Sequence, residues 1–371
     1  MQKQRIRFVR LDRQYESIRS DIDSQIQDVL KSGHFILGPK VKKLEKILAD
    51  YLGVAGTIGL ASGSDALFLS LKALDIGEGD EVITTPHSFF ATASAIARIG
   101  ATPVFCDIDK ETYNLDPLLL EKAINEKTKA IIPVHIYGNP ADMSKFMEIS
   151  REYNIPVIED CAQAIGSSLN GKKIGSIGRL SCFSFFPTKN LGAYGDGGFV
   201  ASDDIKLLER IRALRVHGAK IKYYHEEIGI NSRLDEIQAA ILIAKLPYLD
   251  EWNNRRIELA EIYKKGLHKS FSFQKKLDGA NAVYHLFVVM HEKKAELMVY
   301  LKEMGIDTGI YYPEPLHLQK CFKYLGYKKG DFPFTEMVCN KSFALPLYPE
   351  LKDSEIMYIV DIINKWIKNN I

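Results

Sequence analysis

Residues 179–198 read RLSCFSFFPTKNLGAYGDGG, and this stretch decides the fold. The apolar run Leu180–Phe185 and the run Gly198–Ala201 predict two strands, so that Lys189 lies in the turn between them. Three phenylalanines precede this lysine and four glycines follow it, which favours a tight turn in apolar surroundings. Burial lowers the pKa of an amine, and a neutral amine can act as a nucleophile and form a Schiff base. The alternative is an ordinary solvated loop lysine.

A second candidate group ends the preceding strand. Val157-Ile-Glu-Asp160 is an apolar run that closes on two carboxylates, and Cys161-Ala-Gln163 follows it. Ligands bind at the carboxyl ends of parallel strands, so we expect Asp160 at the ligand-binding edge of a sheet. A buried carboxylate there needs a cationic partner, such as a protonated pyridinium nitrogen. The alternative is that Asp160 caps the next helix.

Short apolar runs alternate with longer amphipathic stretches on both sides of this pair, which indicates an α/β fold. Repeated strand, helix and strand patterns predict a largely parallel sheet that helices cover on both faces. The expected strands are Glu81–Thr84, Thr102–Asp107, Lys129–His135, Pro156–Asp160, Leu180–Phe185 and Gly198–Ala201.

The segment Ala61–Ala66, ASGSDA, is expected to begin a helix and to bind an anion. Its small residues leave backbone N–H groups free at the positive end of the helix dipole, and Ser64 adds a hydroxyl; an ordinary helix cap is the alternative.

The segment Gly166–Lys173 is similar to a phosphate-binding loop, but Lys173 stands where Ser or Thr would hold magnesium. We therefore do not interpret this segment as a phosphate-binding loop. A phosphate site, a carboxylate for a ring nitrogen and an amine for an aldehyde together point to pyridoxal 5'-phosphate.

Composition changes near Pro247, where we expect a domain boundary. Residues 1–247 are predicted to form a large cofactor-binding domain, and residues 248–371 a small C-terminal α+β domain with a connecting helix. The other expected elements are the helices Tyr15–Leu30, Val41–Tyr51, Asp235–Leu246, Asp250–Leu267, Lys293–Met304 and Ser354–Asn369 and the strand Val283–Met290.

Charge and cysteine content exclude several classes of function. The chain has 371 residues, and 49 Lys plus Arg against 47 Asp plus Glu leave a charge of +2, which argues against nucleic-acid or membrane-surface binding. No run of about 18 apolar residues predicts a membrane span, and the N-terminal residues lack the apolar core of a signal peptide. Five cysteines without CxxC spacing favour a reducing compartment. We therefore expect a cytoplasmic protein without a metal site.

In its motifs the sequence resembles the DegT/DnrJ/StrS family of nucleotide-sugar aminotransferases, over nearly the whole chain. The resemblance implies fold-type I of the pyridoxal-phosphate enzymes: a mostly parallel seven-stranded sheet flanked by helices, a small C-terminal α+β domain and a homodimer. The motifs are Phe35–Gly38, Ser62–Ser64, Gly79–Val82, His135–Gly138, Glu159–Gln163, Phe183–Phe185, Pro187–Lys189, Gly229–Arg233, Gln238–Ala240, Tyr312–Pro313, His317 and Leu345–Pro349.

The resemblance also implies roles for residues that match these motifs. Lys189 is implied to form the Schiff base and to move the proton during transamination, Asp160 to keep the pyridine nitrogen protonated, and Gln163 to contact the ring 3-oxygen. Phe89 is implied to stack on the ring, and a plain core aromatic is the alternative. The implied phosphate contacts are Gly63, Ser64, Ser184 and, reaching over to the partner subunit's cofactor, Asn231.

The residues implied to contact the substrate are Tyr224, Tyr312 and His317. A surface histidine is the alternative for His317. The family commonly has Thr at the position of Ser64 and His at the position of Tyr311. Further possible contacts with a diphosphate, or else members of a solvated helix face, are Arg212, Arg215 and Lys220.

The implied activity is a ping-pong transfer of an amino group from L-glutamate to a keto group of a nucleotide-linked keto-deoxy-hexose, for glycan or secondary-metabolite biosynthesis. The stretch around Lys189 and the segment from His217 to Tyr224 look most like members that aminate C3, with C4 amination as the alternative. A sugar dehydratase of the same fold has histidine in place of the Schiff-base lysine, and Lys189 argues against it. A regulator that binds nucleotide sugar without turnover is a further alternative, although Lys189, Asp160 and Gln163 together favour catalysis.

Overall fold

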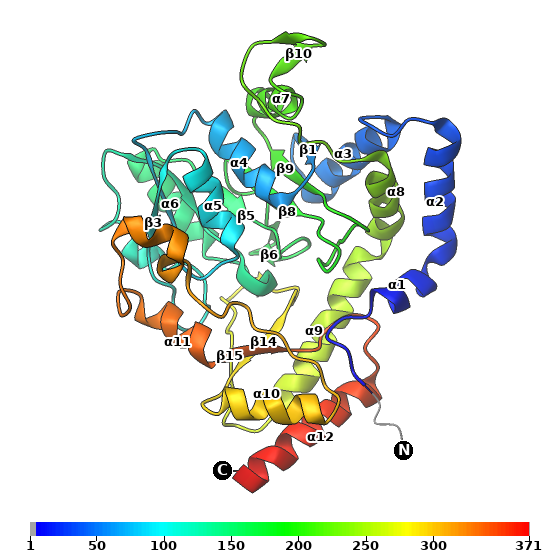
Figure 1. Cartoon of the computed structure of the whole chain (residues 1–371), viewed down its shortest axis with the longest axis vertical. Helices are drawn as coiled ribbons and strands as arrows, with labels where there is room; N and C mark the ends of the chain where they lie inside the picture. Colours follow the sequence, from blue (N-terminus) through cyan, green and yellow to red (C-terminus); the bar gives the residue numbers. More distant parts are fainter. Residues whose placement is uncertain (1–4, 371) are drawn as a thin grey trace.

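The computed structural model describes residues 5–370, and a seven-stranded sheet forms its centre (Figure 1). Across the sheet the strands are β3 (Thr102–Phe105), β2 (Glu81–Thr84), β4 (Thr128–Ile132), β5 (Ile158–Asp160), β8 (Leu180–Ser184), β9 (Gly198–Ser202) and β1 (Gly56–Leu60). Parallel bridges Ile131–Val157 and Val134–Asp160 join β4 to β5. Six strands run parallel, and β9 runs antiparallel to its neighbours β8 and β1. The predicted mostly parallel α/β sheet is confirmed.

Successive side chains of the strands enter two apolar layers, one on each face of the sheet. Ile131 of β4 belongs to the layer under α3, α6 and α8, and the next residue, Ile132, belongs to the layer under α4, α5 and α7. This alternation follows from the two-residue period of a strand. The covering helices are α3 (Pro39–Leu52), α4 (Gly63–Ala73), α5 (Phe90–Arg98), α6 (Met143–Tyr153), α7 (Ile205–Leu214) and α8 (Glu236–Lys245).

Strand β1 is absent from the prediction because its sequence, GTIGL, holds two glycines. Glycine in a strand loses much backbone entropy and gives no side chain to pack. In the structure a Cβ on Gly59 would lie 3.2 Å from the Leu234 Cβ, so the strand and the segment before α8 approach closely at this point. Tertiary packing therefore forms a strand that local propensity does not indicate.

The N-terminal helix predicted as Tyr15–Leu30 is two helices. Helix α1 (Leu11–Ser17) ends at Ile18, whose φ of −131° is not helical, and α2 (Arg19–Ser32) continues to Gly33 with a φ of +66°. The Ile18 side chain is buried in a cluster with Trp252. The break turns this side chain into the cluster, while glycine stops the second helix in the left-handed conformation that it adopts readily.

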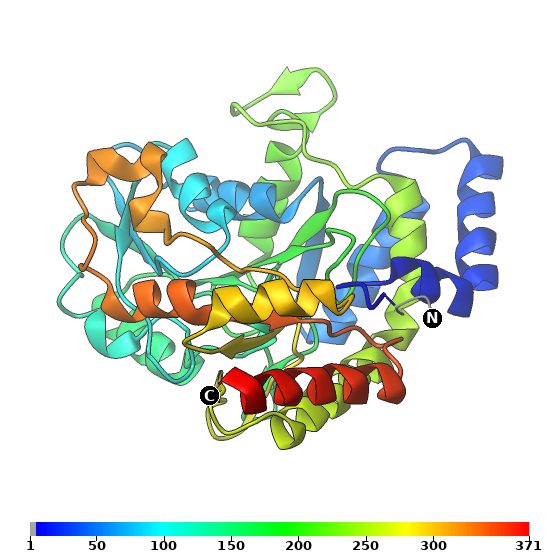
Figure 2. The same ribbon diagram turned by 60° about the horizontal axis from the view of Figure 1, so that its bottom comes forward.

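The C-terminal part packs a small sheet against two long helices. One of them, α12 (Asp353–Asn370), is the red helix of Figure 2, where it lies beside the other, α9 (Leu249–Gly266). The strand predicted as Val283–Met290 is shortened to Phe287–Met290, because Tyr284 has a φ of +43°. The elements are α9 (Leu249–Gly266), β12 (Ser272–Phe273), β14 (Phe287–Met290), α10 (Lys294–Glu303), α11 (Pro333–Lys341), β15 (Ser342–Leu345) and α12 (Asp353–Asn370). The division into domains 1–247 and 248–371 stays a prediction.

Short pieces complete the fold. The hairpin of β10 and β11 projects from the body next to α7 (Figure 1). The short strands are β6 (Ser168–Leu169), β7 (Lys172–Lys173), β10 (Ala219–Ile221), β11 (Tyr224–His225) and β13 (Ala280–Asn281). Within residues 5–370, no helix has both the length and the apolar character required to cross a bilayer.

Candidate active site

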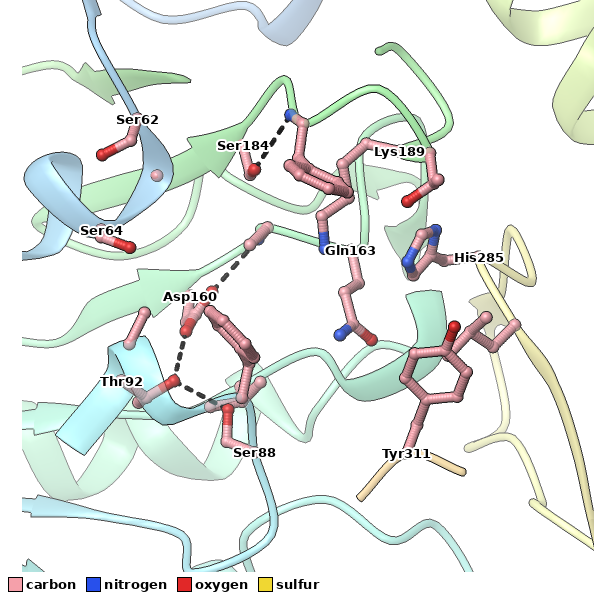
Figure 3. A pocket seen from close by; sticks show the side chains of 18 of the residues that line it. Ser62, Ser64, Ser88, Thr92, Asp160, Gln163, Ser184, Lys189, His285 and Tyr311 are labelled. Carbon is pink, nitrogen blue, oxygen red and sulfur yellow. Dashed lines mark hydrogen bonds between the residues drawn. The ribbon is translucent and has the colours of Figure 1, made fainter. Parts of the chain in front are cut away.

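A cavity of about 520 Å³ opens where β5 and β8 end, at the edge of the sheet expected to bind ligands. Figure 3 shows side chains from α4, α5, β5, β8 and the segment before β14 converging on it. The predicted site residues that line it are Gly63, Ser64, Phe89, Asp160, Gln163, Ser184, Lys189 and Tyr312. The predicted residues outside its lining are Tyr224, Asn231 and His317.

Lys189 reaches the cavity from the turn that links β8 to β9. Its backbone N–H donates to the Phe186 carbonyl oxygen (2.8 Å), and a Cβ on Gly192 would lie only 2.3 Å from the Pro187 carbonyl oxygen, so the turn requires glycine at this position. Burial lowers the pKa of the Lys189 amine to about 8, although the charge of Asp160 partly offsets this. The amine lines the cavity and is no solvated loop lysine, and it loses its proton more easily than an exposed lysine does.

Asp160 is held by hydrogen bonds at the end of β5. Its Oδ2 accepts from the Thr92 hydroxyl (2.7 Å), and its Oδ1 accepts from the Ala162 N–H (3.2 Å). Because Thr92 donates to Asp160, the Ser88 hydroxyl (2.7 Å) is the donor to Thr92. Burial raises the pKa of Asp160, against the effects of these donors and of Lys189. A turn follows Asp160, so the helix-cap alternative is wrong.

Gln163 and Tyr312 lie side by side in the cavity lining. The Gln163 Oε1 accepts from the Tyr137 N–H (2.7 Å), and its Nε2 donates to the Tyr312 hydroxyl (3.1 Å). These two contacts determine which way the amide points. Phe89 is 55% exposed and its ring centroid lies 5.9 Å from that of Tyr312, so Phe89 is no core aromatic.

The third part of the cavity is the N-terminus of α4. The Ser62 Oγ accepts from the Asp65 N–H (3.1 Å) and caps the helix. A Cβ on Gly63 would lie 2.8 Å from the Ser184 Cβ, so only glycine lets β8 approach the helix this closely. Unpaired backbone N–H groups at the start of a helix attract anions, and the nearby Ser64 and Ser184 side chains carry hydroxyls. This end of the cavity suits a phosphate.

Three predicted substrate or cofactor contacts lie elsewhere. Tyr224 and Asn231 are exposed on the projecting hairpin and the segment after it. His317 is 2% exposed, its Nε2 lies 3.2 Å from the Glu336 Oε1, and its ring packs against Phe332, so the surface-histidine alternative is wrong.

The suggested diphosphate contacts are occupied by carboxylates of the chain itself. Arg215 is buried, and its Nη1 donates to the Glu45 Oε1 (2.6 Å) and to the Gly59 carbonyl oxygen (2.8 Å). Arg212 pairs with Glu45 and Glu209, and Lys220 with Glu226. The suggestion is wrong for Arg215, because this residue ties α3 to β1 inside the protein.

Sequence reasoning missed several residues of the cavity wall, which are Ser88, Thr92, Arg256, His285 and Tyr311. Ser88 and Tyr311 are direct neighbours of the predicted site residues Phe89 and Tyr312, and this adjacency could have indicated them. Thr92, Arg256 and His285 are each more than 60 residues from both Lys189 and Asp160, and tertiary folding brings them to the cavity.

The cavity fits pyridoxal 5'-phosphate. It combines an amine with a lowered pKa, a buried carboxylate whose charge lacks a bound cation, and a helix N-terminus with hydroxyls. These groups match the aldehyde, the ring nitrogen and the phosphate of that molecule. Similar solved structures include one with the cofactor PMP bound and one described as a PLP form.

Known proteins are similar to this chain over its whole length. A Geobacillus stearothermophilus protein named pleiotropic regulatory protein is 48% identical over 97% of this chain and 98% of its own. UDP-N-acetyl-3-dehydro-alpha-D-glucosamine 3-aminotransferase of Acidithiobacillus ferrooxidans is 42% identical over 97% of both chains. The crystal structure of Streptomyces venezuelae DesV in complex with a ketimine intermediate has a TM-score of 0.95 and 40% identity and covers 98% of both chains.

The match to a family is equally extensive. The sequence profile of the DegT/DnrJ/EryC1/StrS aminotransferases matches residues 16–364. The fold, the cavity and the relatives agree with this profile. The chain belongs to the DegT/DnrJ/EryC1/StrS aminotransferase family and is a pyridoxal-phosphate-dependent aminotransferase.

Proposed function

We propose that this enzyme moves an amino group from L-glutamate to the C3 keto group of a nucleotide-linked keto-deoxy-hexose. The observation that carries the proposal is the shared cavity of Lys189, Asp160 and the N-terminus of α4. The amine, the buried carboxylate and the anion site suit pyridoxal phosphate, which accepts the amino group from one substrate and passes it to the next.

The cofactor supplies an aldehyde that reacts with amines and a ring that withdraws electrons from the neighbouring carbon. Asp160 faces the ring nitrogen in our proposal and keeps it protonated, and the hydrogen bonds from Thr92 and Ala162 oppose the rise in the pKa of Asp160 that burial causes. Gln163 points its amide at the ring oxygen, and Phe89 covers the ring. The phosphate group is held by Gly63, Ser64 and Ser184.

Lys189 moves the proton in both halves of the reaction. A general acid and base works best when its pKa lies near the working pH, and the pKa of about 8 of this amine meets that condition. Burial provides the shift, so the same apolar walls that exclude water also make the amine reactive. Tyr312, which lines the cavity, is proposed to face the sugar.

Support for C3 comes from the name of the Acidithiobacillus relative, which specifies a 3-dehydro sugar and a 3-aminotransferase. The decisive experiment incubates the protein with L-glutamate and a panel of 3-keto and 4-keto nucleotide sugars. Product mass and the position of the new amine are then determined. We expect amination at C3, and exclusive amination at C4 would refute this part of the proposal.

The role of Lys189 is tested by absorbance. Pyridoxal phosphate bound through Lys189 absorbs visible light, and L-glutamate is expected to change that absorbance. Borohydride reduction followed by peptide mapping should find the cofactor on Lys189, and Lys189→Ala should abolish both signals. Equal spectra of wild type and Lys189→Ala with added cofactor would show that the assignment is wrong.

A second candidate function is a regulator that binds nucleotide sugar without turnover, which the name of the Geobacillus relative favours. Such a protein would bind sugar nucleotide without any spectral response to L-glutamate. A sugar dehydratase is disfavoured because Lys189 is present where that class has histidine.

We further propose a homodimer in the cytoplasm. Asn231 is exposed beside the projecting hairpin, whose apolar side chains include Ile221, Tyr223 and Ile228. A partner subunit that covers this surface would bring Asn231 to the other cofactor. Five free cysteines, four of them buried, suit a reducing compartment.

A further inference from the structure

We infer that Arg256 binds a carboxylate of the amino donor in the cavity. The inference rests on the proposed function, since it assigns the donor of that reaction a residue. Arg256 belongs to α9, lines the cavity together with Phe8 and Leu347, and is 5% exposed. Neither the family motifs quoted above nor local sequence patterns point to it.

The guanidinium of Arg256 has unused donors. Its Nη1 donates to the Leu347 carbonyl oxygen (2.9 Å) and to the Tyr284 carbonyl oxygen (3.4 Å). Its Nε is buried and has no hydrogen-bond partner, and among residues 5–370 no partner is found for its Nη2. The buried Nε is closed to a ligand, so the donors that remain for a ligand in the cavity are the two N–H groups of Nη2.

The positive charge of Arg256 is also uncompensated by a contact. Burial lowers its pKa to about 10, and the charge of Glu350 opposes this shift from a distance, so the group remains protonated at neutral pH. Within the described chain Arg256 forms no ion pair, and Glu350 does not line the cavity. A buried charge destabilises a protein unless it is paired, so an unpaired cation on a cavity wall indicates an anionic ligand.

His285 lines the cavity together with Lys189 and Arg256. Burial lowers the pKa of the His285 imidazole, and the charges of Lys189 and Arg256 lower it further. Because the Asn190 Nδ2 donates to Asn253 and to the Val283 carbonyl oxygen, its Oδ1 faces His285 and accepts from Nδ1 (3.2 Å). Burial lowers the pKa of His285 well below its usual value, so the imidazole is neutral at neutral pH, and Arg256 is the cation that can attract an anion beside Lys189.

A carboxylate of an amino acid fits this arrangement. An amino donor carries its amine and a carboxylate on one carbon, and a dicarboxylic donor has a second carboxylate a few bonds away. With its amine at Lys189, such a molecule can present a carboxylate to Arg256. The Nη2 donors of the charged guanidinium form strong hydrogen bonds with a carboxylate, and the apolar walls strengthen the attraction because they exclude water.

The test measures binding to the enzyme loaded with pyridoxal phosphate. Glutarate, a dicarboxylate without an amine, is titrated by calorimetry, and uridine diphosphate is titrated separately. We expect Arg256→Gln to weaken glutarate binding about tenfold or more, Arg256→Lys to weaken it less, and neither to change diphosphate binding beyond about twofold. Arg255→Gln is the matched control, because Arg255 pairs with Glu258 and Asp353 away from the cavity, and it should bind glutarate like wild type.

Circular dichroism and cofactor absorbance establish that each variant is folded and loaded. Should Arg256→Gln fail to fold, Arg256→Lys carries the comparison. Absence of glutarate binding by wild type, unchanged binding by the folded Arg256 variants, or an equal loss of diphosphate binding would each overturn the inference. If no keto sugar served as acceptor, the proposed function would be refuted. The glutarate measurement does not depend on that result, so the two failures can be distinguished.

Discussion

Lys189 and Asp160 set each other's charge across the cavity. The carboxylate raises the pKa of the amine, while burial lowers it further than the carboxylate raises it, and the result is about 8. In turn the ammonium opposes the increase that burial causes in the pKa of Asp160. The two residues are therefore coupled, and a change in one alters the chemistry of the other.

The first prediction concerns the pH dependence of cofactor capture by the cofactor-free protein. Only the neutral amine attacks an aldehyde, so the rate should rise with pH through a midpoint near 8, below the 10.5 of an ordinary lysine. Asp160→Asn removes the carboxylate that raises this pKa, and the midpoint should move to lower pH. Stopped-flow absorbance against pH measures both values.

Thr92→Ser is the control, because it keeps the hydroxyl that donates to Asp160. Its midpoint should equal that of wild type. A wild-type midpoint near 10, or an upward shift in Asp160→Asn, would contradict the electrostatic account.

At the scale of elements, α3 receives its N-terminal cap from a different helix. The residue before α3, Gly38, has no side chain to cap it, and the Glu236 carboxylate of α8 accepts from the N–H groups of Lys40 (2.9 Å) and Val41 (2.8 Å) instead. A carboxylate at this end of a helix also interacts favourably with the helix dipole. The pair α3 and α8 is thereby held together under one face of the sheet.

The second prediction follows from the space that this cap occupies. A Cβ on Gly38 would lie 2.8 Å from the Cδ and Oε2 of Glu236. Gly38→Ala should therefore displace the carboxylate and lower the free energy of unfolding by about 1–3 kcal/mol. Urea denaturation monitored by fluorescence measures the change.

Gly77→Ala provides the comparison, because the nearest atom to its Cβ would be the Ile99 carbonyl oxygen at 3.9 Å. This variant should unfold like wild type. Equal stability of Gly38→Ala and wild type would mean that the Glu236 cap is dispensable.

At the scale of the whole molecule, the projecting hairpin exposes large apolar side chains that no other part of the described chain covers. Ile228 is 87% exposed and Tyr223 is 79% exposed, and the segment continues to Asn231. Large apolar side chains gathered on a protruding segment indicate a surface that another protein covers. This agrees with the dimer proposed above.

The third prediction is a test of site sharing between subunits. Lys189→Ala and Asn231→Ala should each be inactive or impaired alone. If Asn231 serves the partner's site, a mixed dimer holds one site with both lesions and one intact site. Equal mixing after reversible dissociation should then restore about one quarter of wild-type activity.

The same mixture gives the contrary result if Asn231 acts on its own subunit's cofactor, because every site would then carry one lesion. Mixing of Lys189→Ala with unmutated but inactivated protein controls for dissociation itself. Light scattering of each sample reports the oligomeric state, and a monomer under all conditions would refute the dimer.

Local sequence patterns were enough to predict the strands with apolar runs, the turn around Lys189 and the strand end at Asp160. These features are local, because strand periodicity, glycine content and the position of a polar residue after an apolar run depend on neighbouring residues. The same local signals failed for β1, which has two glycines, and for the break at Ile18. In both places, packing against distant residues overrode local propensity.

Tertiary packing determines which other side chains share the cavity with Lys189. Thr92 and Arg256 come from helices far apart in the chain, and His317, which a motif suggested, packs against Glu336 instead. The physical reason is that charge compensation acts through space. Asp160 accepts a hydrogen bond from Thr92, and Arg256 has no anionic partner in the described chain, because of their positions in the folded protein. Residues adjacent to them in sequence do not indicate either property.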